Sequence, residues 1–345
     1  MHISEFDYEL PQELIAQQPL KQRDASRMLV VDREKKAWVE TDFASLPDYV
    51  RENDVLVINN TRVSPARLVG QREPSGGRVE VLLVRELGPS VWEALVKPGA
   101  RLRQGARVKF GDSRLRADVL DAPGNSLRHL RFHYEGPWDG VLEEVGETPL
   151  PPYISRPAGT TPGDRERYQT IFARQKGAIA APTAGLHFTT QVFDRVLARG
   201  AQITEITLHV GYGTFEPVRV NDVAQHRVAS EEFELCEKAA STINDARAGG
   251  GRVIAVGTTT SRALESSVNA KGQLEPARAK ADLTIVPGYK FRMVDALLTN
   301  FHLPRSSLLL LVCAFAGRDL VLQAYRHAVY RDYRFYSYGD CMLLI

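Results

Sequence analysis

Five clusters in this chain combine hydroxyl, amide and imidazole side chains, and four of them directly follow an apolar run. They lie at residues 59–62, 182–188, 209–215, 258–262 and 299–302. Side chains of these types hydrogen-bond small polar ligands, and an imidazole can accept a proton near neutral pH. The clusters therefore predict an enzyme that acts on a small, polar or anionic ligand.

The segment Thr258–Arg262 follows an apolar run and begins a predicted helix. Free backbone N–H groups at a helix start bind carboxylates and phosphates, and a guanidinium one turn later can hold a carboxylate with two hydrogen bonds. The alternative is that the threonines are a plain helix N-cap. The residues alone leave both interpretations open.

His187, His209 and His302 are the histidines of these clusters. His187 lies between two apolar residues, where a histidine is more often a buried core residue than a functional one, and the other two have similar odds. Glu231 is by default a solvated surface charge. Position alone therefore does not identify a proton acceptor.

Common fingerprints of cofactor and metal sites are missing. Residues 209–213 contain Gly-x-Gly after a strand, but Glu216 stands where a dinucleotide loop needs its third glycine. The sequence has no Walker loop, no His-Glu-x-x-His and no common zinc spacing, and its three cysteines are widely separated. We therefore expect neither a metal site nor a disulfide framework, with Cys313 as a core residue.

Length and composition indicate an ordinary globular protein. The 345 residues are 43% apolar and 25% charged, enough for about two domains of roughly 150 residues. The longest apolar run, Leu308–Ala316, is far shorter than the ~20 residues that span a bilayer. The first residues lack a basic start followed by an apolar stretch, so we expect a cytoplasmic protein without a signal peptide.

Strand and helix signals alternate from Pro151 onward, whereas residues 1–63 are a mixed start that ends in an apolar strand and a polar turn. We expect strands at 55–58, 203–210 and 252–256, a polar turn at 59–62, and helices at 190–199 and 237–248. Such alternation is typical of βα units in a mostly parallel sheet or an α/β barrel, where ligands bind at the carboxyl ends of strands. The polar clusters fall at such places.

The middle of the chain, from about Ser64 to Leu150, has short runs of period-two alternation separated by Gly and Pro pairs. This pattern predicts a small antiparallel sheet or barrel. Basic residues concentrate between positions 97 and 116, against one acid, Asp112. They are Lys97, Arg101, Arg103, Arg107, Lys109, Arg114 and Arg116. This set is either a solvated face or a surface that tracks phosphates.

Taken in order, the clusters and several flanking segments resemble the S-adenosylmethionine:tRNA ribosyltransferase-isomerases of queuosine biosynthesis. The matching segments are Asn59–Val63 with Pro65–Leu68, Gly76–Leu82, Leu150–Ile154, Asp164–Thr170, Ala181–Phe188, Leu208–Gly211, Gly257–Thr259, Thr299–Pro304 and Tyr338–Asp340. The specificity comes from their order and their spread over most of the chain.

The resemblance implies an α/β-barrel-like large domain, residues 1–63 and 151–345, with an inserted antiparallel β-barrel at 64–150. The basic stretch of the insert is the candidate contact with tRNA. The resemblance also implies the reaction. The ribosyl moiety of S-adenosylmethionine is transferred to 7-aminomethyl-7-deazaguanine at the tRNA wobble position and isomerised, which gives epoxyqueuosine-tRNA and releases adenine and methionine.

The implied chemistry assigns roles to the cluster residues. The sulfonium acidifies the neighbouring ribose carbon, so a base must remove one proton, with His187, His209 or the carboxylate of Glu231 as candidates. Tyr212 or Phe215 could stabilise the cation. Arg262 and the Thr258–Thr259 helix start suit the methionine carboxylate, and the amides of Asn59, Asn60 and Asn300 suit a base edge or ribose hydroxyls. The other expected substrate contacts are Thr61, Arg62, Thr183, Gly185, Gly211 and His302, and the expected tRNA contacts are Arg101, Arg103, Arg107 and Lys109.

One departure from the family pattern concerns the segment His226–Glu231. The family often has a second histidine where this chain has Ala229. We therefore place the base elsewhere. Two rival functions remain at this stage: an S-adenosylmethionine-dependent methyltransferase, which would yield S-adenosylhomocysteine, and a non-catalytic RNA-binding protein, which would show no turnover. We expect S-adenosylmethionine as a substrate, no metal, no membrane, and a monomer.

Overall fold

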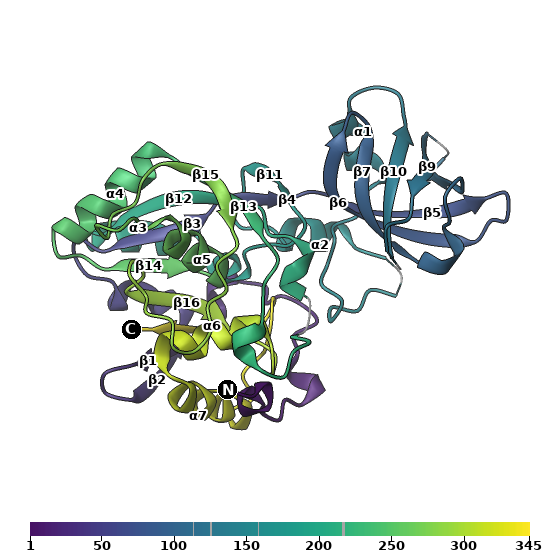
Figure 1. The fold of residues 1–345 in the computed structure, drawn as a ribbon. Coiled ribbons are helices and arrows are strands. Elements are labelled where there is room, and N and C mark those ends of the chain that lie inside the picture. Colours follow the sequence, from purple (N-terminus) through teal and green to yellow (C-terminus); the bar gives the residue numbers. More distant parts are fainter. Residues whose placement is uncertain (113, 125, 158, 216–217) are drawn as a thin grey trace.

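The computed structural model describes residues 1–112, 114–124, 126–157, 159–215 and 218–345. Two parts stand beside each other, a large α/β domain and a smaller β-barrel (Figure 1). The large domain is formed by both ends of the chain, and the barrel is formed by its middle. The mixed α/β class and the inserted antiparallel barrel are therefore confirmed, while the boundaries at residues 64 and 150 stay a prediction.

The large domain is built on a nine-stranded sheet of order β15-β13-β12-β3-β14-β16-β17-β1-β2. In chain order the strands are β1 (Arg27–Asp32), β2 (Ala37–Asp42), β3 (Val55–Asn59), β12 (Gln202–Leu208), β13 (Glu231–Leu235), β14 (Val253–Val256), β15 (Ala277–Ala281), β16 (Ala296–Asn300) and β17 (Cys341–Leu344). The sheet is open, with β15 and β2 as its edge strands. The large domain is therefore barrel-like at most, because no hydrogen bonds close its sheet into a barrel.

The expectation of a mostly parallel sheet is wrong, because the sheet is mixed. Strands β12, β3, β14 and β16 run parallel to one another, as do β17 and β1, whereas the β15–β13, β13–β12, β16–β17 and β1–β2 pairs are antiparallel. The parallel block has the expected βα connections. Three of the antiparallel pairs lie toward the ends of the sheet, whereas β16–β17 lies in its interior and joins the two parallel blocks.

The central strand β3 explains why the sheet has two apolar faces. All five of its residues are buried, as expected of a strand covered on both sides. Val55 and Val57 belong to one apolar cluster and Leu56 and Ile58 to the other, in accordance with the two-residue period of a strand. The predicted strand at 55–58 is confirmed, but Thr61–Val63 forms the short strand β4 where we expected a polar turn.

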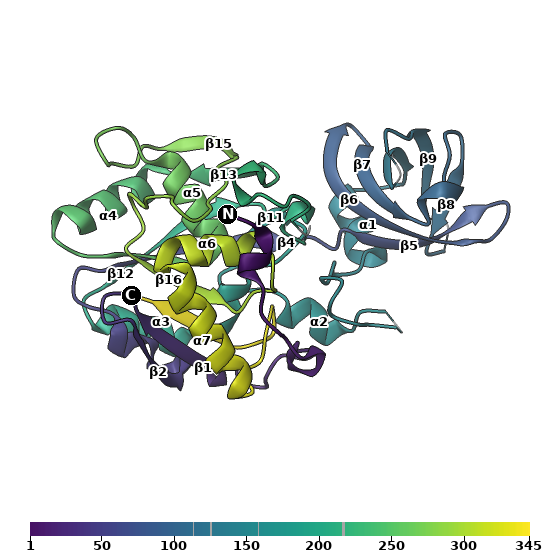
Figure 2. The ribbon, with the colours of Figure 1, turned by 60° about the horizontal axis from the view of Figure 1, so that its bottom comes forward.

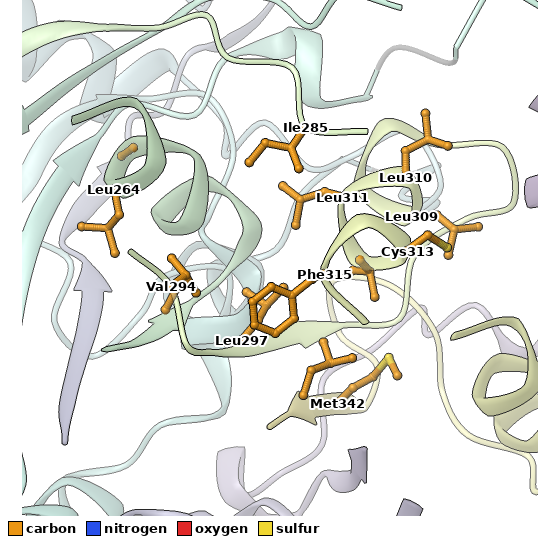
Figure 3. Close-up of a cluster of buried hydrophobic side chains, with 14 of the residues drawn as sticks. Leu264, Ile285, Val294, Leu297, Leu309, Leu310, Leu311, Cys313, Phe315 and Met342 are labelled. Atoms are coloured by element: carbon orange, nitrogen blue, oxygen red, sulfur yellow. The ribbon is translucent and has the colours of Figure 1, made fainter. Parts of the chain in front are cut away.

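Helices cover both faces of the sheet. The larger cluster packs α4 (Glu237–Ala248), α5 (Thr258–Ser267), α6 (Ser307–Ala316) and α7 (Arg318–Tyr330) on one face. Figure 2 shows α6 and α7 lying across it. Figure 3 shows Leu311 of α6 beside Ile285 and Phe315 of α6 beside Leu297, with Cys313 in the same core. The smaller cluster includes α3 (Thr190–Ala198) on the opposite face. The predicted helices at 190–199 and 237–248 are confirmed.

The barrel closes through six antiparallel strands in the order β10-β7-β6-β5-β8-β9. They are β5 (Arg67–Glu73), β6 (Arg78–Gly88), β7 (Val91–Lys97), β8 (Arg107–Phe110), β9 (Leu115–Asp121) and β10 (Leu127–His133), followed by α1 (Trp138–Val145). Their inward residues form a separate apolar core. Its sequence pattern is period-two because each strand has one buried and one exposed face.

The large domain and the barrel are joined by a strand pair and by ion pairs, in addition to the two segments of chain that connect them. The short strand β11 (Gln175–Ala178) pairs in parallel with β4 where the chain passes between the two parts. Lys176 Nζ lies 2.8 Å from Asp139 on α1, and Arg165 on α2 (Pro162–Arg167) forms an ion pair with Glu143 on α1. These contacts fix the barrel beside the carboxyl ends of the large sheet.

Within the described residues, no single helix is long and apolar enough to cross a membrane. Helices α6 and α7 reach that length only together, with a bend of 117° between them.

Candidate active site

The main cavity of the large domain, called here the strand-end cavity, has a volume of about 410 Å³. Segments that follow β11, β12, β14 and β16 line it, with two further loops around residues 152–168 and 336–337. Parallel α/β sheets bind ligands at the carboxyl ends of their strands, and the cavity has this location. Its polar lining residues are Tyr153, Tyr168, Thr183, Thr258, Thr259, Thr299, Asn300, His302, Arg305, Ser306, Tyr336 and Ser337.

Asn300 ends strand β16 and lies at the centre of a hydrogen-bond chain. Its Oδ1 accepts from Thr183 Oγ1 at 2.9 Å, and its Nδ2 lies 3.2 Å from His187 Nε2 and 3.2 Å from the Tyr336 carbonyl oxygen. An amide N–H donates to the histidine only if that nitrogen carries no proton. Asn300 therefore presents a fixed orientation to the cavity, set from behind by a neutral His187.

His187 itself does not line the strand-end cavity. It is 3% exposed and stacks near the ring of Phe43, with centroids 5.2 Å apart. Burial lowers its pKa to about 4, and the positive charges of Arg23 and Arg334 contribute in the same direction. His187, one of the expected bases, is therefore separated from the strand-end cavity by Asn300, and it can act on a ligand there only through Asn300.

His302 is the one imidazole among the described residues that line this cavity, and no carboxylate lines it. Its Nε2 lies 2.8 Å from Thr299 Oγ1, and its main-chain carbonyl accepts from Tyr8 Oη. Burial lowers its pKa to about 3, so the ring is neutral at physiological pH. A neutral imidazole can accept a proton from a ligand in the cavity.

The start of helix α5 forms another part of the wall. The chain turns into the helix at Gly257, whose φ of 94° lies in the region that favours glycine, and no side chain caps this end. Thr258 and Thr259, the first two helical residues, face the cavity. The first N–H groups of an uncapped ten-residue helix are a suitable partner for a carboxylate.

Three tyrosines line the opposite side, and sequence analysis assigned none of them a role. The rings of Tyr153 and Tyr336 are 4.0 Å apart between centroids, and Tyr153 Oη lies 2.6 Å from Ser337 Oγ. Tyr168 is fully buried against the cavity. Tyr153 and Tyr168 lie in segments that carry the family resemblance, which is the signal that could have identified them.

His209 and the asparagines of the 59–62 cluster lie elsewhere. His209 lies in an open groove of about 390 Å³ beside β13, called here the β13 groove, lined by Thr207, His209, Glu232, Phe233, Glu234, Arg278, Ala279 and Lys280. Its Nδ1 is 2.8 Å from Thr61 Oγ1, and burial lowers its pKa. The structure does not bring His209 to the strand-end cavity.

Asn59 and Asn60 support the backbone between β3 and β12. Asn59 Oδ1 accepts from the N–H groups of Thr61 and Leu208, and its Nδ2 donates to the Leu208 carbonyl. Asn60 hydrogen-bonds Thr207 and Glu205. Their polar atoms are thus used by the protein itself. These hydrogen bonds give the residues a structural role, and the expected substrate contact of Asn59, Asn60 and Thr61 stays a prediction.

Glu231 and Arg262 form a buried ion pair away from the strand-end cavity. Arg262 Nη1 lies 2.6 Å from Glu231 Oε2, and its other donors contact the carbonyl oxygens of Leu283, Ala229 and Ala281. Glu231 Oε1 accepts from Gly211 N–H at 2.9 Å. In this structure the pair holds the segments around residues 211 and 229 in place. The expected roles of Arg262 toward the methionine carboxylate and of Glu231 as a base stay predictions.

The remaining expected contacts have other surroundings. A side chain at Gly185 would meet the ring of Phe172 at 2.7 Å, so this glycine serves close packing. Gly211 and Tyr212 lie outside the cavity lining, Arg62 is exposed on β4, and the side chain of Phe215 lies outside the described residues. Of the expected substrate contacts, the cavity brings together Thr183, Thr258, Thr259, Asn300 and His302.

The basic residues of the barrel lie on its outside. Arg101 and Arg103 are exposed beside an open hollow with Arg72, and Arg107 and Lys109 point outward from β8. Arg107 lies 3.5 Å from Asp118 on β9 at a largely exposed position. Part of this positive charge is thus matched by a neighbour. Among the described residues, no group of three or more His, Cys, Asp or Glu could hold a metal ion.

Comparison with known proteins gives matches along the whole chain. The family model described as a queuosine biosynthesis protein matches residues 3–344. Proteins named S-adenosylmethionine:tRNA ribosyltransferase-isomerase from Symbiobacterium thermophilum and Halothermothrix orenii are 52% and 48% identical over 345 residues, covering 100% of both chains.

A solved structure is also similar. It is an S-adenosylmethionine tRNA ribosyltransferase from Thermotoga maritima, 36% identical, with a TM-score of 0.57, covering 99% of this chain and 100% of that one.

Proposed function

This chain belongs to the queuosine biosynthesis protein family, and we propose that it is an S-adenosylmethionine:tRNA ribosyltransferase-isomerase. It transfers the ribosyl moiety of S-adenosylmethionine to 7-aminomethyl-7-deazaguanine in tRNA and isomerises it. Adenine and methionine leave, and epoxyqueuosine-tRNA remains. Full-length identity near 50% to proteins of this name carries the conclusion.

S-adenosylmethionine binds in the strand-end cavity in this proposal. The start of α5, at Thr258 and Thr259, is suited to the methionine carboxylate, because its N–H groups have no side-chain cap. The rings of Tyr153 and Tyr336, which are in contact and tilted by 52°, offer π surfaces to the sulfonium. Asn300 is held in one orientation by Thr183 and His187, and its Oδ1 keeps one acceptor site that can take a hydrogen bond from a ribose hydroxyl or from an amino group of the base.

His302 accepts the proton in this proposal. The ribose carbon next to the sulfonium must lose a proton, and a base must lie within hydrogen-bond reach of it. His302 meets the requirement of location, because it lines the cavity, and its burial keeps the ring neutral. The lowered pKa makes it a weak base in the free enzyme, so the bound substrate must supply part of the driving force through the acidity of the carbon.

tRNA is bound in part by the barrel in this proposal, and the modified base occupies the wobble position. Arg101, Arg103, Arg107 and Lys109 lie on the barrel's outer surface, where phosphates can reach them. Substituting both Arg101 and Arg107 by Glu should raise the KM for tRNA about tenfold or more and leave the KM for S-adenosylmethionine unchanged. If the KM for S-adenosylmethionine changes and the KM for tRNA does not, this surface does not bind tRNA. We further propose that the protein acts in the cytoplasm as a monomer.

The decisive experiment identifies the small products. The enzyme is incubated with S-adenosylmethionine and tRNA carrying 7-aminomethyl-7-deazaguanine, and the products are separated. Equal amounts of adenine and methionine are expected. S-adenosylhomocysteine would instead identify a methyltransferase, and the absence of any turnover would contradict an enzymatic role.

A further inference from the structure

A small arginine-lined hollow lies next to the strand-end cavity, and none of the roles above uses it. This hollow, called here the Arg23 notch, is lined by residues that include Arg23, Arg167, Leu186, His187, Ser337 and Tyr338. Ser337 lines both hollows, and the rings of Tyr338 and Tyr168 meet edge to face, 5.9 Å apart between centroids. A group bound in the notch is therefore a close neighbour of a ligand in the cavity.

The arginines of the notch are held in place by carbonyl oxygens. Arg23 donates to the carbonyls of Leu186 and Glu166 at 3.1 and 3.3 Å, and Arg167 donates to those of Lys21 and Leu20 at 3.0 and 2.8 Å. Neither guanidinium lies within ion-pair distance of a carboxylate among the described residues. The nearest carboxylate that acts on Arg23 is that of Glu166, which is exposed. Two half-buried positive charges thus lack a direct counterion.

Two buried donors of residues that line the notch also lack a partner. Within the part of the chain that the structure describes, Arg167 Nε and Tyr338 Oη are buried without a hydrogen bond. Tyr338 is 4% exposed and lines the notch. Leaving such groups unpaired destabilises the protein, and more so for charged groups. Their gathering in one place points to an anionic ligand that satisfies them.

The size of the notch limits what this ligand can be. Its volume is about 20 Å³, which admits one or two oxygen atoms but no ring. A nucleoside or an amino acid therefore does not fit, whereas the non-bridging oxygens of a phosphate in a chain that passes over the surface do. Phosphates in an RNA backbone also position the polynucleotide without reading its sequence.

We propose that the Arg23 notch is a phosphate subsite that holds the RNA backbone next to the nucleotide undergoing modification. The proposal rests on the proposed function only for the identity of the polynucleotide. Arg23 and Arg167 supply the charge, and Tyr338 Oη donates the neutral hydrogen bond. Because the subsite adjoins the cavity, it fixes the reacting nucleotide against the donor, while the barrel binds more distant parts of the tRNA.

The test measures binding of a fluorescently labelled anticodon stem–loop RNA to the full-length protein, over a range of salt concentrations. Arg167→Gln should weaken binding about tenfold or more, as expected for a lost charge-assisted hydrogen bond. The slope of log Kd against log salt should become shallower by about 0.7–0.9, the contribution of one phosphate contact. Arg326→Gln, a matched loss of one exposed arginine on α7, should leave both values unchanged.

Tyr338→Phe separates ligand binding from folding. The hydroxyl has no partner in the free protein, so its removal should leave the melting temperature unchanged or raise it, while RNA binding weakens several-fold. If Tyr338→Phe lowers stability and leaves RNA binding at the wild-type value, the hydroxyl is structural and the subsite is wrong.

The outcomes distinguish the subsite from the proposed function. Wild-type RNA affinity and salt slope in both Arg167→Gln and Tyr338→Phe contradict the subsite, even if adenine release is normal. A raised KM for S-adenosylmethionine with unchanged RNA affinity also contradicts it, because the notch would then serve the donor. The failure of the wild-type protein to release adenine contradicts the proposed function, whereas the RNA-binding result remains interpretable.

Discussion

The large domain contains two hollows of nearly equal volume and opposite character. The strand-end cavity, about 410 Å³, is lined by apolar groups, tyrosines, hydroxyls and an amide, and Arg305 is the one charged side chain among the described residues that line it. The β13 groove, about 390 Å³, is open and lined by Glu232, Glu234, Arg278 and Lys280. Volume therefore does not decide which hollow is the active site. The cavity brings together neutral polar groups that hydrogen bonds hold in fixed positions, whereas the groove exposes charges that solvent screens.

The sharpest contrast is between the histidines of the two hollows. His302→Ala should slow adenine release at least ~100-fold, the usual effect of losing a general base, while binding of S-adenosylmethionine is retained. His209→Ala, the matched change in the β13 groove, should leave adenine release near the wild-type rate. Single-turnover kinetics with saturating tRNA measures both. A large loss in His209→Ala with little in His302→Ala would reverse our assignment of the two hollows.

His187 provides a second, smaller test, because it reaches the cavity only through Asn300. His187→Ala removes the acceptor for Asn300 Nδ2, and the loss of this fixed orientation should lower kcat/KM about tenfold. His187→Gln restores an acceptor oxygen and should recover most of the activity. If both variants are slowed to the same large extent, His187 is the base and does not act through Asn300.

The buried histidines also predict how stability depends on pH. The pKa of His302 is lowered to about 3 and that of His187 to about 4 in the folded state, from 6.5. Between pH 6.5 and about 4 the unfolded chain binds more protons, so acidification favours unfolding. Each histidine should reduce the free energy of unfolding by up to about 1.4 kcal/mol per pH unit.

Tryptophan fluorescence can assign this acid sensitivity to one part of the molecule. Trp92 and Trp138 lie in the barrel and Trp38 in the large domain, so a variant with Trp92→Phe and Trp138→Phe reports on the large domain alone. In that background His302→Gln should make the dependence of stability on pH shallower. An unchanged slope would show that His302 is not the buried neutral group described here.

The smallest effect is expected in the groove. Lys280→Gln removes a charge from the β13 groove and should leave the KM for S-adenosylmethionine within a factor of about two, because exposed charges contribute little. Its comparison is Thr183→Ala in the cavity, which removes a 2.9 Å hydrogen bond to Asn300 and should raise this constant several-fold. If Lys280→Gln and Thr183→Ala change the KM for S-adenosylmethionine equally, the strand-end cavity is not distinguished from the β13 groove as the binding site.

The sequence predicted the parts of the site that depend on local structure. Thr258 and Thr259 were expected at a helix start after a strand, and Asn300 and His302 at another strand end, because these patterns arise within a few residues. Tyr153 and Tyr336 meet at 4.0 Å although 183 residues separate them, and no local pattern could indicate that contact. Arg262 was predicted at the right helix turn, but which face of α5 points to the cavity depends on tertiary packing.

A crystal structure of the protein with S-adenosylmethionine tests the central claim most directly. Density for the ligand should lie in the strand-end cavity, with the methionine carboxylate at the N-terminus of α5 and the sulfonium between His302 and the Tyr153–Tyr336 pair. Density in the β13 groove beside His209 and Glu232, with the strand-end cavity empty, would contradict it.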